Sequence, residues 1–214
     1  MKYKAVIFDL DGTLVNSIYD IADAMNMVLT KRNYETFDYE TYKTFVGHGV
    51  RSLVVKAIPE ADELLIEECL HDMMTIYSRN CTHKTVAYEG TLELLHTLNS
   101  NGIKLSVLSN KEDSLTKKVA SSLLPSYVSP TIGLKEEHLK KPNPKVLLEI
   151  CRSLGVNPSE SIYLGDTSVD IKVAKNAKML AVGVSWGFRA KEELIEAGAD
   201  YILETPTDLI KILE

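Results

Sequence analysis

Cysteine is scarce in this 214-residue chain: Cys69, Cys81 and Cys151 are the only three. They are far apart, and no C-x-x-C pair occurs. A zinc ribbon and a paired redox motif therefore have no support, and so few cysteines exclude a small disulfide-stapled scaffold. This cysteine usage fits a reducing compartment.

Long hydrophobic runs are also missing. No segment approaches the roughly 18 consecutive apolar residues that a membrane helix needs. Only four apolar residues, at positions 5–8, stand between Lys4 and Asp9, too few for the apolar centre of a secretory signal peptide. We therefore expect a cytoplasmic protein with no membrane partner.

Positive charge is in deficit, with 24 Lys and Arg against 30 Asp and Glu and a net charge of −6. This balance disfavours a nucleic acid as the main partner, although a small anion could still bind at a local site. The composition, 45% hydrophobic and 25% charged, is that of a globular protein. The length lies between those typical of one and of two domains, as expected for one core with a sizeable insertion. The sequence predicts no particular oligomeric state.

Short apolar runs alternate with helical patterns along most of the chain. Continuous apolar runs are typical of strands that are buried on both faces of a parallel sheet. One helical pattern covers residues 91–98 and stops at Asn101-Gly102, and another covers residues 146–154 and stops at Gly155. The alternation predicts an α/β fold with a doubly wound, mostly parallel sheet, that is, a Rossmann-like core. The predicted strands are residues 5–8, 103–108, 162–164, 180–184 and 201–203.

Residues 15–85 interrupt this alternation of strands and helices, because they contain no convincing buried strand. Amphipathic helices are expected there instead, for example at residues 18–30 and 61–79. Such a stretch is too long for a plain connection between two elements. We predict an all-helical domain, residues 15–85, inserted into a core formed by residues 1–14 and 86–214.

Two acidic pairs follow predicted strands. Asp9 and Asp11 are two residues apart after residues 5–8, so in extended backbone both point the same way. Asp166 and Asp170 follow residues 162–164 and can approach one face of a starting helix. Convergent carboxylates repel one another and suit a hard cation such as Mg²⁺. The alternatives are an acidic loop with a glycine turn for the first pair and helix capping for the second.

Two further motifs could bind an anion. Ser109 and Asn110 end a predicted strand before a helix, and Lys141 is held extended by the proline after it. A capping role for Ser109 or Asn110 and a solvated basic turn around Lys141 are the alternatives. A doubly wound sheet gathers all four motifs at one edge. Together they provide a nucleophile, a cation site and positive groups, which is what metal-assisted phosphoryl transfer requires.

With these residues in this order, the chain resembles the haloacid dehalogenase-like hydrolases, in particular their phosphoglycolate phosphatase-like branch. The resemblance spans essentially the whole chain, and residues 15–85 match the cap domain of that family. The segments that carry it are Asp9-Leu-Asp-Gly-Thr13, Ser109-Asn110, Lys141-Pro-Asn-Pro144, Gly165-Asp166 with Asp170, and Val184-Ser-Trp-Gly-Phe-Arg189.

The resemblance implies a role for each matching residue. Asp9 would attack phosphorus to form an aspartyl phosphate, and Asp11 would act as acid and then as base. Ser109, Asn110 and Lys141 would bind the phosphoryl group. Mg²⁺ would be held by the Asp9 carboxylate, the Asp11 backbone carbonyl and Asp166, with Asp170 in support. The substrate would be a small phosphorylated metabolite, a phosphoglycolate-like phosphomonoester.

Specificity is expected in the cap, with His48 and Arg51 as candidates, and Arg51 could bind a substrate carboxylate in bidentate fashion. Arg189 is a further candidate, and either arginine could instead be solvated. A β-phosphoglucomutase-like phosphomutase is the competing enzyme class, because it retains both aspartates. A signalling receiver domain or a catalytically inactive phosphate-binding protein is the non-enzymatic alternative.

Overall fold

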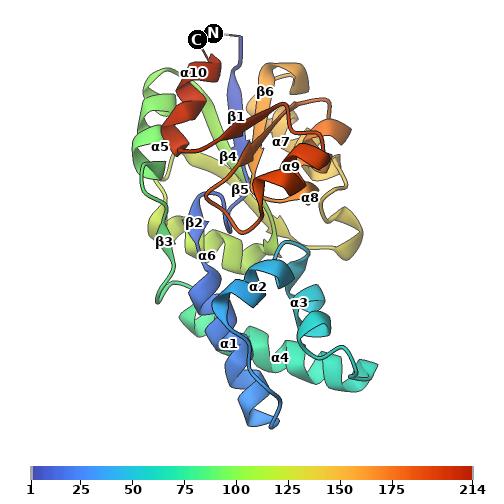
Figure 1. Cartoon of the computed structure of the whole chain (residues 1–214). Helices are drawn as coiled ribbons and strands as arrows, with labels where there is room; N and C mark the ends of the chain where they lie inside the picture. Colours follow the sequence, from blue (N-terminus) through green and yellow to red (C-terminus); the bar gives the residue numbers. More distant parts are fainter. Residues whose placement is uncertain (1, 214) are drawn as a thin grey trace.

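The computed structural model describes residues 2–213 and is built around a parallel sheet (Figure 1). Within these residues the strand order is β5-β4-β1-β6-β7-β8, and every neighbouring pair is parallel. The strands are β1 (Ala5–Phe8), β4 (Lys104–Glu112), β5 (Val128–Leu134), β6 (Ser161–Gly165), β7 (Leu180–Val184) and β8 (Tyr201–Leu203). The predicted α/β class with a mostly parallel sheet is confirmed.

Helices cover both faces of this sheet, because the central strand buries side chains in both directions. Ala5 and Ile7 of β1 belong to one buried cluster with residues of α7 and α8. Val6 and Phe8 belong to a second cluster with residues of α5 and α6. The helices of this layer are α5 (Thr91–Ser100), α6 (Asp113–Leu123), α7 (Lys145–Leu154), α8 (Ser168–Asn176), α9 (Lys191–Glu196) and α10 (Ile210–Leu213), with short 3₁₀ turns η1 (Glu137–Leu139), η2 (Pro158–Glu160) and η3 (Pro206–Leu209).

The five predicted strands correspond to β1, β4, β6, β7 and β8, whereas β5 was not predicted. Its sequence contains Pro130 and Gly133, which break the apolar run. Proline is tolerated there because β5 is an edge strand. Strand β4 is also longer than expected and continues through Asn110 to Glu112, so no helix starts directly after Ser109-Asn110.

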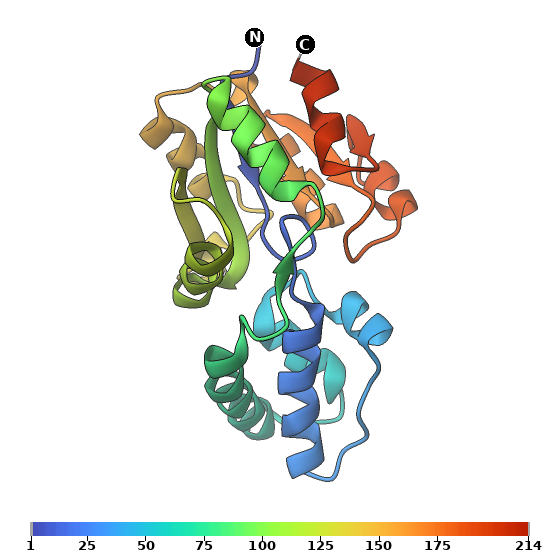
Figure 2. The ribbon, with the colours of Figure 1, turned by 90° about the vertical axis from the view of Figure 1, so that its left-hand side faces the viewer.

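Helices α1 (Ile18–Lys31), α2 (Tyr39–Phe45), α3 (Gly49–Ala57) and α4 (Glu63–Asn80) gather at the end of the molecule opposite the two termini (Figures 1 and 2). The helices expected at residues 18–30 and 61–79 correspond to α1 and α4. No helix within residues 2–213 is both long enough and apolar enough to cross a membrane. The exact division into core and inserted domain stays a prediction.

The chain runs from the sheet to these four helices once and returns once, and the two connecting segments lie side by side. Strands β2 (Val15–Asn16) and β3 (Val86–Ala87) pair antiparallel at this point. The buried carboxylate of Asp20 accepts hydrogen bonds from the Lys84 backbone N–H at 2.9 Å and from the Thr85 backbone N–H and hydroxyl at 2.8 and 2.7 Å. This two-stranded ribbon was not predicted, because two residues are too short to show a strand pattern.

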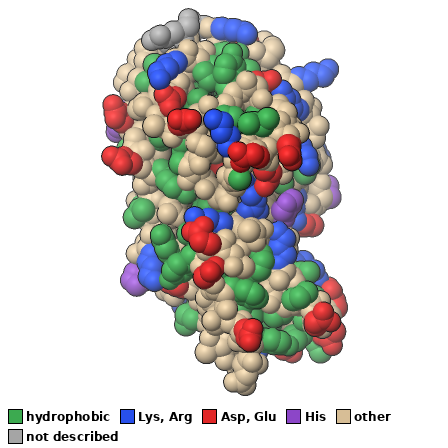
Figure 3. All heavy atoms as spheres, in the orientation of Figure 1, with side chains coloured by type: hydrophobic (Ala, Val, Ile, Leu, Met, Phe, Trp, Pro, Cys, Tyr) green, Lys and Arg blue, Asp and Glu red, His purple; other side chains and the backbone are tan. Residues whose placement is uncertain are grey.

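Acidic, basic and hydrophobic side chains are interspersed over the face shown in Figure 3. That face therefore offers no continuous patch of one charge. Cys69, Cys81 and Cys151 are all buried and none is in a disulfide.

Candidate active site

Three aspartates converge at the carboxyl ends of the central strands. Asp9 follows β1, Asp166 follows β6, and Asp170 lies in the first turn of α8. Each offers a carboxylate oxygen within 4.8 Å of those of the other two, and all three side chains are buried. The sheet therefore brings together three of the four predicted metal-binding residues through their side chains.

Lys141 is buried among these acids. Its ammonium lies 2.8 Å from Asp9 Oδ1 and 2.7 Å from Asp170 Oδ1, and it also donates to the Tyr163 hydroxyl at 3.0 Å. The Lys141 backbone N–H donates to Asn110 Oδ1 at 2.8 Å. This bond fixes residues 140–144, here called the lysine loop, against β4. Lys141 is thus held in place from both its backbone and its side chain.

The backbone around Asp166 approaches it so closely that glycine is required. Asp166 Oδ2 accepts the Phe188 backbone N–H at 2.8 Å, and Oδ1 accepts the Thr13 hydroxyl at 3.2 Å. A Cβ on Gly12 would lie 2.2 Å from Asp166 Oδ2, and one on Gly187 would lie 2.2 Å from Asp166 Cβ. Gly12 also has φ +86°, a left-handed conformation that favours glycine.

Asp170 combines two functions. Its Oδ2 accepts the Thr167 backbone N–H at 3.1 Å and the Thr167 hydroxyl at 2.6 Å, which caps α8. Its Oδ1 faces Lys141 at the same time. The capping interpretation and the site interpretation of this residue are therefore both compatible with the structure.

The negative charge of the cluster is only partly balanced. Burial raises the pKa of Asp9 to about 7; Lys141 works against this rise, and the charge of Asp170 adds to it. Burial, with Asp170 and Asp9 nearby, also holds the pKa of Asp166 well above its ordinary value. Three ionised carboxylates beside one ammonium would leave two negative charges, which one divalent cation would neutralise.

The donor atoms indicate which kind of cation the cluster could hold. The buried Asp9 Oδ1 lies 2.8 Å from the Lys141 ammonium, and each of the three groups that could bind a metal is a carboxylate. Oxygen-only donors suit Mg²⁺ better than Zn²⁺. The residues therefore fit a hard divalent cation.

The Asp11 side chain is not part of this triad. It pairs with Lys111 at 2.5 Å, and both side chains are buried. The Lys111 ammonium also lies 5.0 Å from the ring centroid of Tyr77 on α4. Burial alone would lower the pKa of Lys111, but the neighbouring Asp11 carboxylate raises it overall.

Lys111 was not assigned a role from the sequence. The signal was present, because Ser109 and Lys111 are two residues apart on one strand and so share a face. It was hidden by the expectation that the strand ends at Ser109-Asn110. Thr13 and Tyr163 were also missed, since their contacts with Asp166 and Lys141 come from distant parts of the chain.

Ser109 and Asn110 differ in their availability. Ser109 lines a pocket with Asp9 and Asp11, and within residues 2–213 the only hydrogen bond of its hydroxyl is a long one of 3.3 Å, accepted from the Lys111 backbone N–H. The Asn110 amide, in contrast, donates to the carbonyls of Gly47 at 3.1 Å and Lys141 at 3.3 Å. Asn110 therefore connects the helical segment to the lysine loop.

The three candidate specificity residues do not line this pocket. The Arg51 guanidinium pairs with Glu63 and, at 3.2 Å, with Glu67. Arg189 donates to the backbone carbonyls of Lys43, Thr44 and Val46, the last at 2.6 Å. His48 immediately precedes α3, and burial together with nearby Lys56 lowers its pKa.

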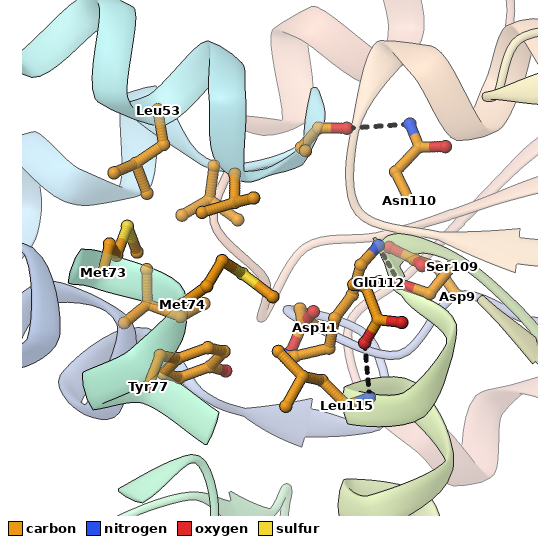
Figure 4. Close-up of a pocket in the computed structure, with 16 residues that line it drawn as sticks. Asp9, Asp11, Leu53, Met73, Met74, Tyr77, Ser109, Asn110, Glu112 and Leu115 are labelled. Atoms are coloured by element: carbon orange, nitrogen blue, oxygen red, sulfur yellow. Dashed lines mark hydrogen bonds and ion pairs between the residues drawn. The ribbon is translucent and has the colours of Figure 1, made fainter. Parts of the chain in front are cut away.

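The pocket lies between the strand ends and helices α1, α3 and α4, and its volume is about 60 Å³. Figure 4 shows Leu53, Met73, Met74 and Tyr77 on one side, facing Asp9, Asp11 and Ser109. The acidic cluster is therefore reached from a cavity with an apolar wall.

Comparison with known proteins agrees with this geometry. A sequence model of the haloacid dehalogenase-like hydrolases matches residues 6–184. Phosphoglycolate phosphatases of Aquifex aeolicus and Chromobacterium violaceum are 32% and 33% identical to the chain, over 99% of it and 97% and 96% of their own lengths. A crystal structure described as a predicted phosphoglycolate phosphatase from Haemophilus somnus has a TM-score of 0.92 at 26% identity and covers 100% of this chain and 99% of that one.

Proposed function

We propose, since the chain belongs to the haloacid dehalogenase-like hydrolases and to their phosphoglycolate phosphatase-like branch, that it is a Mg²⁺-dependent phosphatase that works through an aspartyl phosphate. That the chain is a phosphatase follows from its relatives. The metal, the intermediate and the roles of the residues are our proposal. Its substrate is a small phosphorylated metabolite, and the three free cysteines fit action in the cytoplasm.

The observation that carries this proposal is the buried cluster of three carboxylates around the Lys141 ammonium at the strand ends. Mg²⁺ would be held by the Asp9 and Asp166 carboxylates and the Asp11 backbone carbonyl, with Asp170 in support. When bound, it would neutralise charge on the phosphoryl oxygens and make phosphorus more electrophilic. Lys141 and Ser109 bind the remaining phosphoryl oxygens.

The reaction proceeds in two displacements at phosphorus. An Asp9 carboxylate oxygen forms a bond to phosphorus while the ester P–O bond breaks, and the leaving oxygen takes a proton from the Asp11 carboxyl. In the second step Asp11 accepts a proton from water as that water attacks phosphorus. The bond between phosphorus and Asp9 then breaks, which releases phosphate and regenerates both aspartates.

The helical segment 15–85 serves as a cap in this scheme. Its residues close the pocket over Asp9 and Asp11, and Asn110 and Arg189 link it to the core through backbone carbonyls. Closure excludes water while the aspartyl phosphate forms, and reopening admits the hydrolytic water.

The test is the Asp9→Asn variant, assayed for phosphate release with Mg²⁺ and with a chelator. We expect turnover to fall below detection because the attacking carboxylate is lost. The melting temperature should not fall, because one charge leaves a repulsive cluster. Asp23→Asn, on the exposed side of α1, is the matched control and should retain activity.

Near-normal turnover by Asp9→Asn would reject the assignment, and undiminished activity in chelator would reject the metal. Free phosphate is the expected product. An isomerised sugar phosphate in its place would assign the chain to the phosphomutases.

A further inference from the structure

We propose that Glu193, in the first turn of α9, is a positioning residue that connects closure of the cap to the aspartates of the cation site. The inference rests on the proposed function, because it takes the helical segment as a cap and the acidic cluster as a cation site. Glu193 does not line the pocket. It acts through Ser168 and Arg189, which its two carboxylate oxygens contact.

One carboxylate oxygen of Glu193 binds the start of α8. Oε1 accepts the backbone N–H of Ser168, the first residue of that helix, at 3.0 Å. The first N–H groups of a helix have no partner within it, so an acceptor from elsewhere has to satisfy them. A carboxylate is also favoured at this end by the helix dipole. Glu193 therefore fixes the first turn of α8 from a different element of the fold.

The start of α8 positions two acids of the cation site. Ser168 lies two residues after Asp166 and two before Asp170. The third acid, Asp9, follows a different strand, so the spacing of the cluster depends on where α8 starts relative to β1. Groups that orient metal ligands in this way influence their affinity for the metal. A shift of Ser168 would therefore change the affinity of the cluster for a cation.

The second carboxylate oxygen of Glu193 contacts the arginine that binds the cap. Oε2 lies 3.3 Å from Arg189 Nε. The terminal nitrogens of the same guanidinium donate to the carbonyls of Lys43, Thr44 and Val46 in the cap. The Arg189 side chain is only 12% exposed, and a charge that is this buried needs an opposite charge beside it. Glu193 supplies that charge and orients the guanidinium towards the cap.

The cap meets the start of α8 at the same place. Gly47 directly follows Val46, and a Cβ on Gly47 would lie 3.4 Å from Thr167 Cγ2 and 3.7 Å from a terminal nitrogen of Arg189. The Thr167 hydroxyl in turn donates to Asp170 Oδ2 at 2.6 Å. The cap backbone thus packs against Arg189 and against the residue that precedes α8.

The connection works in both directions. A cap contact that steadies the aspartates strengthens cation binding, and by reciprocity the cap contact is stronger by the same free energy when the cation is bound. The cap therefore closes more stably over a loaded site than over a site without its cation. Closure over a substrate that cannot yet be cleaved is thereby disfavoured.

The Glu193→Ala variant removes both contacts. We expect Mg²⁺ affinity, measured by calorimetry on the metal-free protein, to fall about fivefold, which is the worth of one hydrogen bond. KM for phosphoglycolate, or for nitrophenyl phosphate if that is hydrolysed faster, should rise about threefold, as expected for the loss of a half-exposed ion pair. The kcat value at saturating Mg²⁺ should stay close to the parental one. Glu192→Ala, exposed in the same turn of α9, is the matched control.

Glu193→Gln separates the two contacts. Its amide oxygen can still accept the Ser168 N–H, but the amide has no charge to pair with Arg189. Mg²⁺ affinity should return to within about twofold of the parental value, whereas KM should stay as high as in Glu193→Ala. A merely structural role would lower the melting temperature of the variants without moving Mg²⁺ affinity or KM.

Arg189→Gln tests the connection itself, because it weakens the cap contact and leaves the bond between Glu193 and Ser168 in place. We expect it to weaken Mg²⁺ binding about threefold in the parental protein. In the Glu193→Ala background the same substitution should have no further effect on Mg²⁺ binding, since the connection is already cut.

Parental Mg²⁺ affinity and KM in Glu193→Ala would overturn the inference and leave the phosphatase intact. Additive effects of Glu193→Ala and Arg189→Gln on Mg²⁺ affinity would also overturn it, because the two residues would then act separately. A parental protein that neither binds Mg²⁺ nor hydrolyses either ester would instead reject the proposed function on which the inference rests.

Discussion

Lys141 shows how one side chain can serve both stability and chemistry. Its buried ammonium lies within 2.8 Å of two carboxylates that repel each other. In the metal-free protein it is the nearest counter-charge to the cluster. In the proposed reaction, the same charge would face the phosphoryl group.

Replacing Lys141 by Met should therefore have two measurable effects. We expect kcat to fall by about 10²–10³ because a positive group on the transition state is lost. The free energy of unfolding of the metal-free protein should fall by about 3–5 kcal/mol, because buried carboxylates lose their partner. Denaturant titration and steady-state kinetics would measure the two effects.

Lys140→Met is the control, since the ion pair of Lys140 is with the exposed Glu137. A Lys141→Met enzyme that loses no more activity than this neighbour would contradict the role of the ammonium.

Gly12 allows a test of whether the close approach of the backbone holds Asp166 in place. A Cβ at this position would strike Asp166, whereas a Cβ on Gly102, which also has positive φ, meets nothing within 4 Å. Gly12→Ala and Gly102→Ala should both lose about 1 kcal/mol from backbone strain. Only Gly12→Ala should in addition lose activity and Mg²⁺ affinity, as measured by kinetics and calorimetry. Equal losses in both would show that Asp166 is not held by this close approach.

At the scale of elements, Arg189 connects the loop after β7 to the carbonyls of Lys43 and Thr44 in the last turn of α2 and of Val46 just after it. We expect Arg189→Gln to raise KM by about tenfold, because the closed cap loses hydrogen bonds from a charged donor but the glutamine amide can still donate to one of the carbonyls, so the net loss is about that of one such bond. The kcat value should change less, because no reacting atom is touched. Arg152→Gln, on the exposed side of α7, should leave KM unchanged. If both variants kept the parental KM, Arg189 would not hold the cap.

Buried strands were predictable because parallel strands covered on both faces are apolar throughout. Strand β1 and β7 occur where the sequence places them. Strand β5 was not predicted, because its position at the edge of the sheet permits Pro130, which interrupts the apolar run. A continuous apolar run in the sequence indicates a strand that is fully buried, and an edge strand is only partly buried.

The convergence of Asp9 and Asp166 was predictable from strand ends, and Asp170 follows because it opens the helix after β6. Lys141 lies in the loop between η1 and α7, so its approach to these acids was predicted only from the combination of motifs. The partners of Arg51 were not predictable, because Glu63 and Glu67 lie on the next helix of the bundle and no local pattern pairs them. The contact of Lys111 with Asp11 likewise joins residues 100 positions apart. Contacts between helices and loops depend on their relative placement, which periodicity does not encode.

At the scale of the molecule, stability should depend on both pH and Mg²⁺. The pKa of Asp9 is raised from 3.8 to about 7 in the folded protein. Between these pH values the unfolded chain has released the proton that the folded chain still holds. Metal-free stability should therefore decline as pH rises from about 4 to 7, by a few kcal/mol.

Mg²⁺ binds the ionised carboxylates, so it should reverse this decline. The rise in melting temperature on adding Mg²⁺ should be small near pH 4 and largest above pH 7, as thermal scans in chelator and in Mg²⁺ would show. Asp9→Asn should flatten the metal-free profile. A Mg²⁺ effect of the same size at pH 4 and pH 7 would contradict a site built on these acids.

The pairing of β2 with β3 has an evolutionary consequence. The helical segment leaves and rejoins the sheet at neighbouring points, about one strand spacing of 4.8 Å apart. A segment attached in this way can grow, shrink or be exchanged without stretching the strands that carry the aspartates. Descendants of one ancestral enzyme can therefore acquire new substrates by swapping this module while the phosphate-cleaving machinery is inherited unchanged.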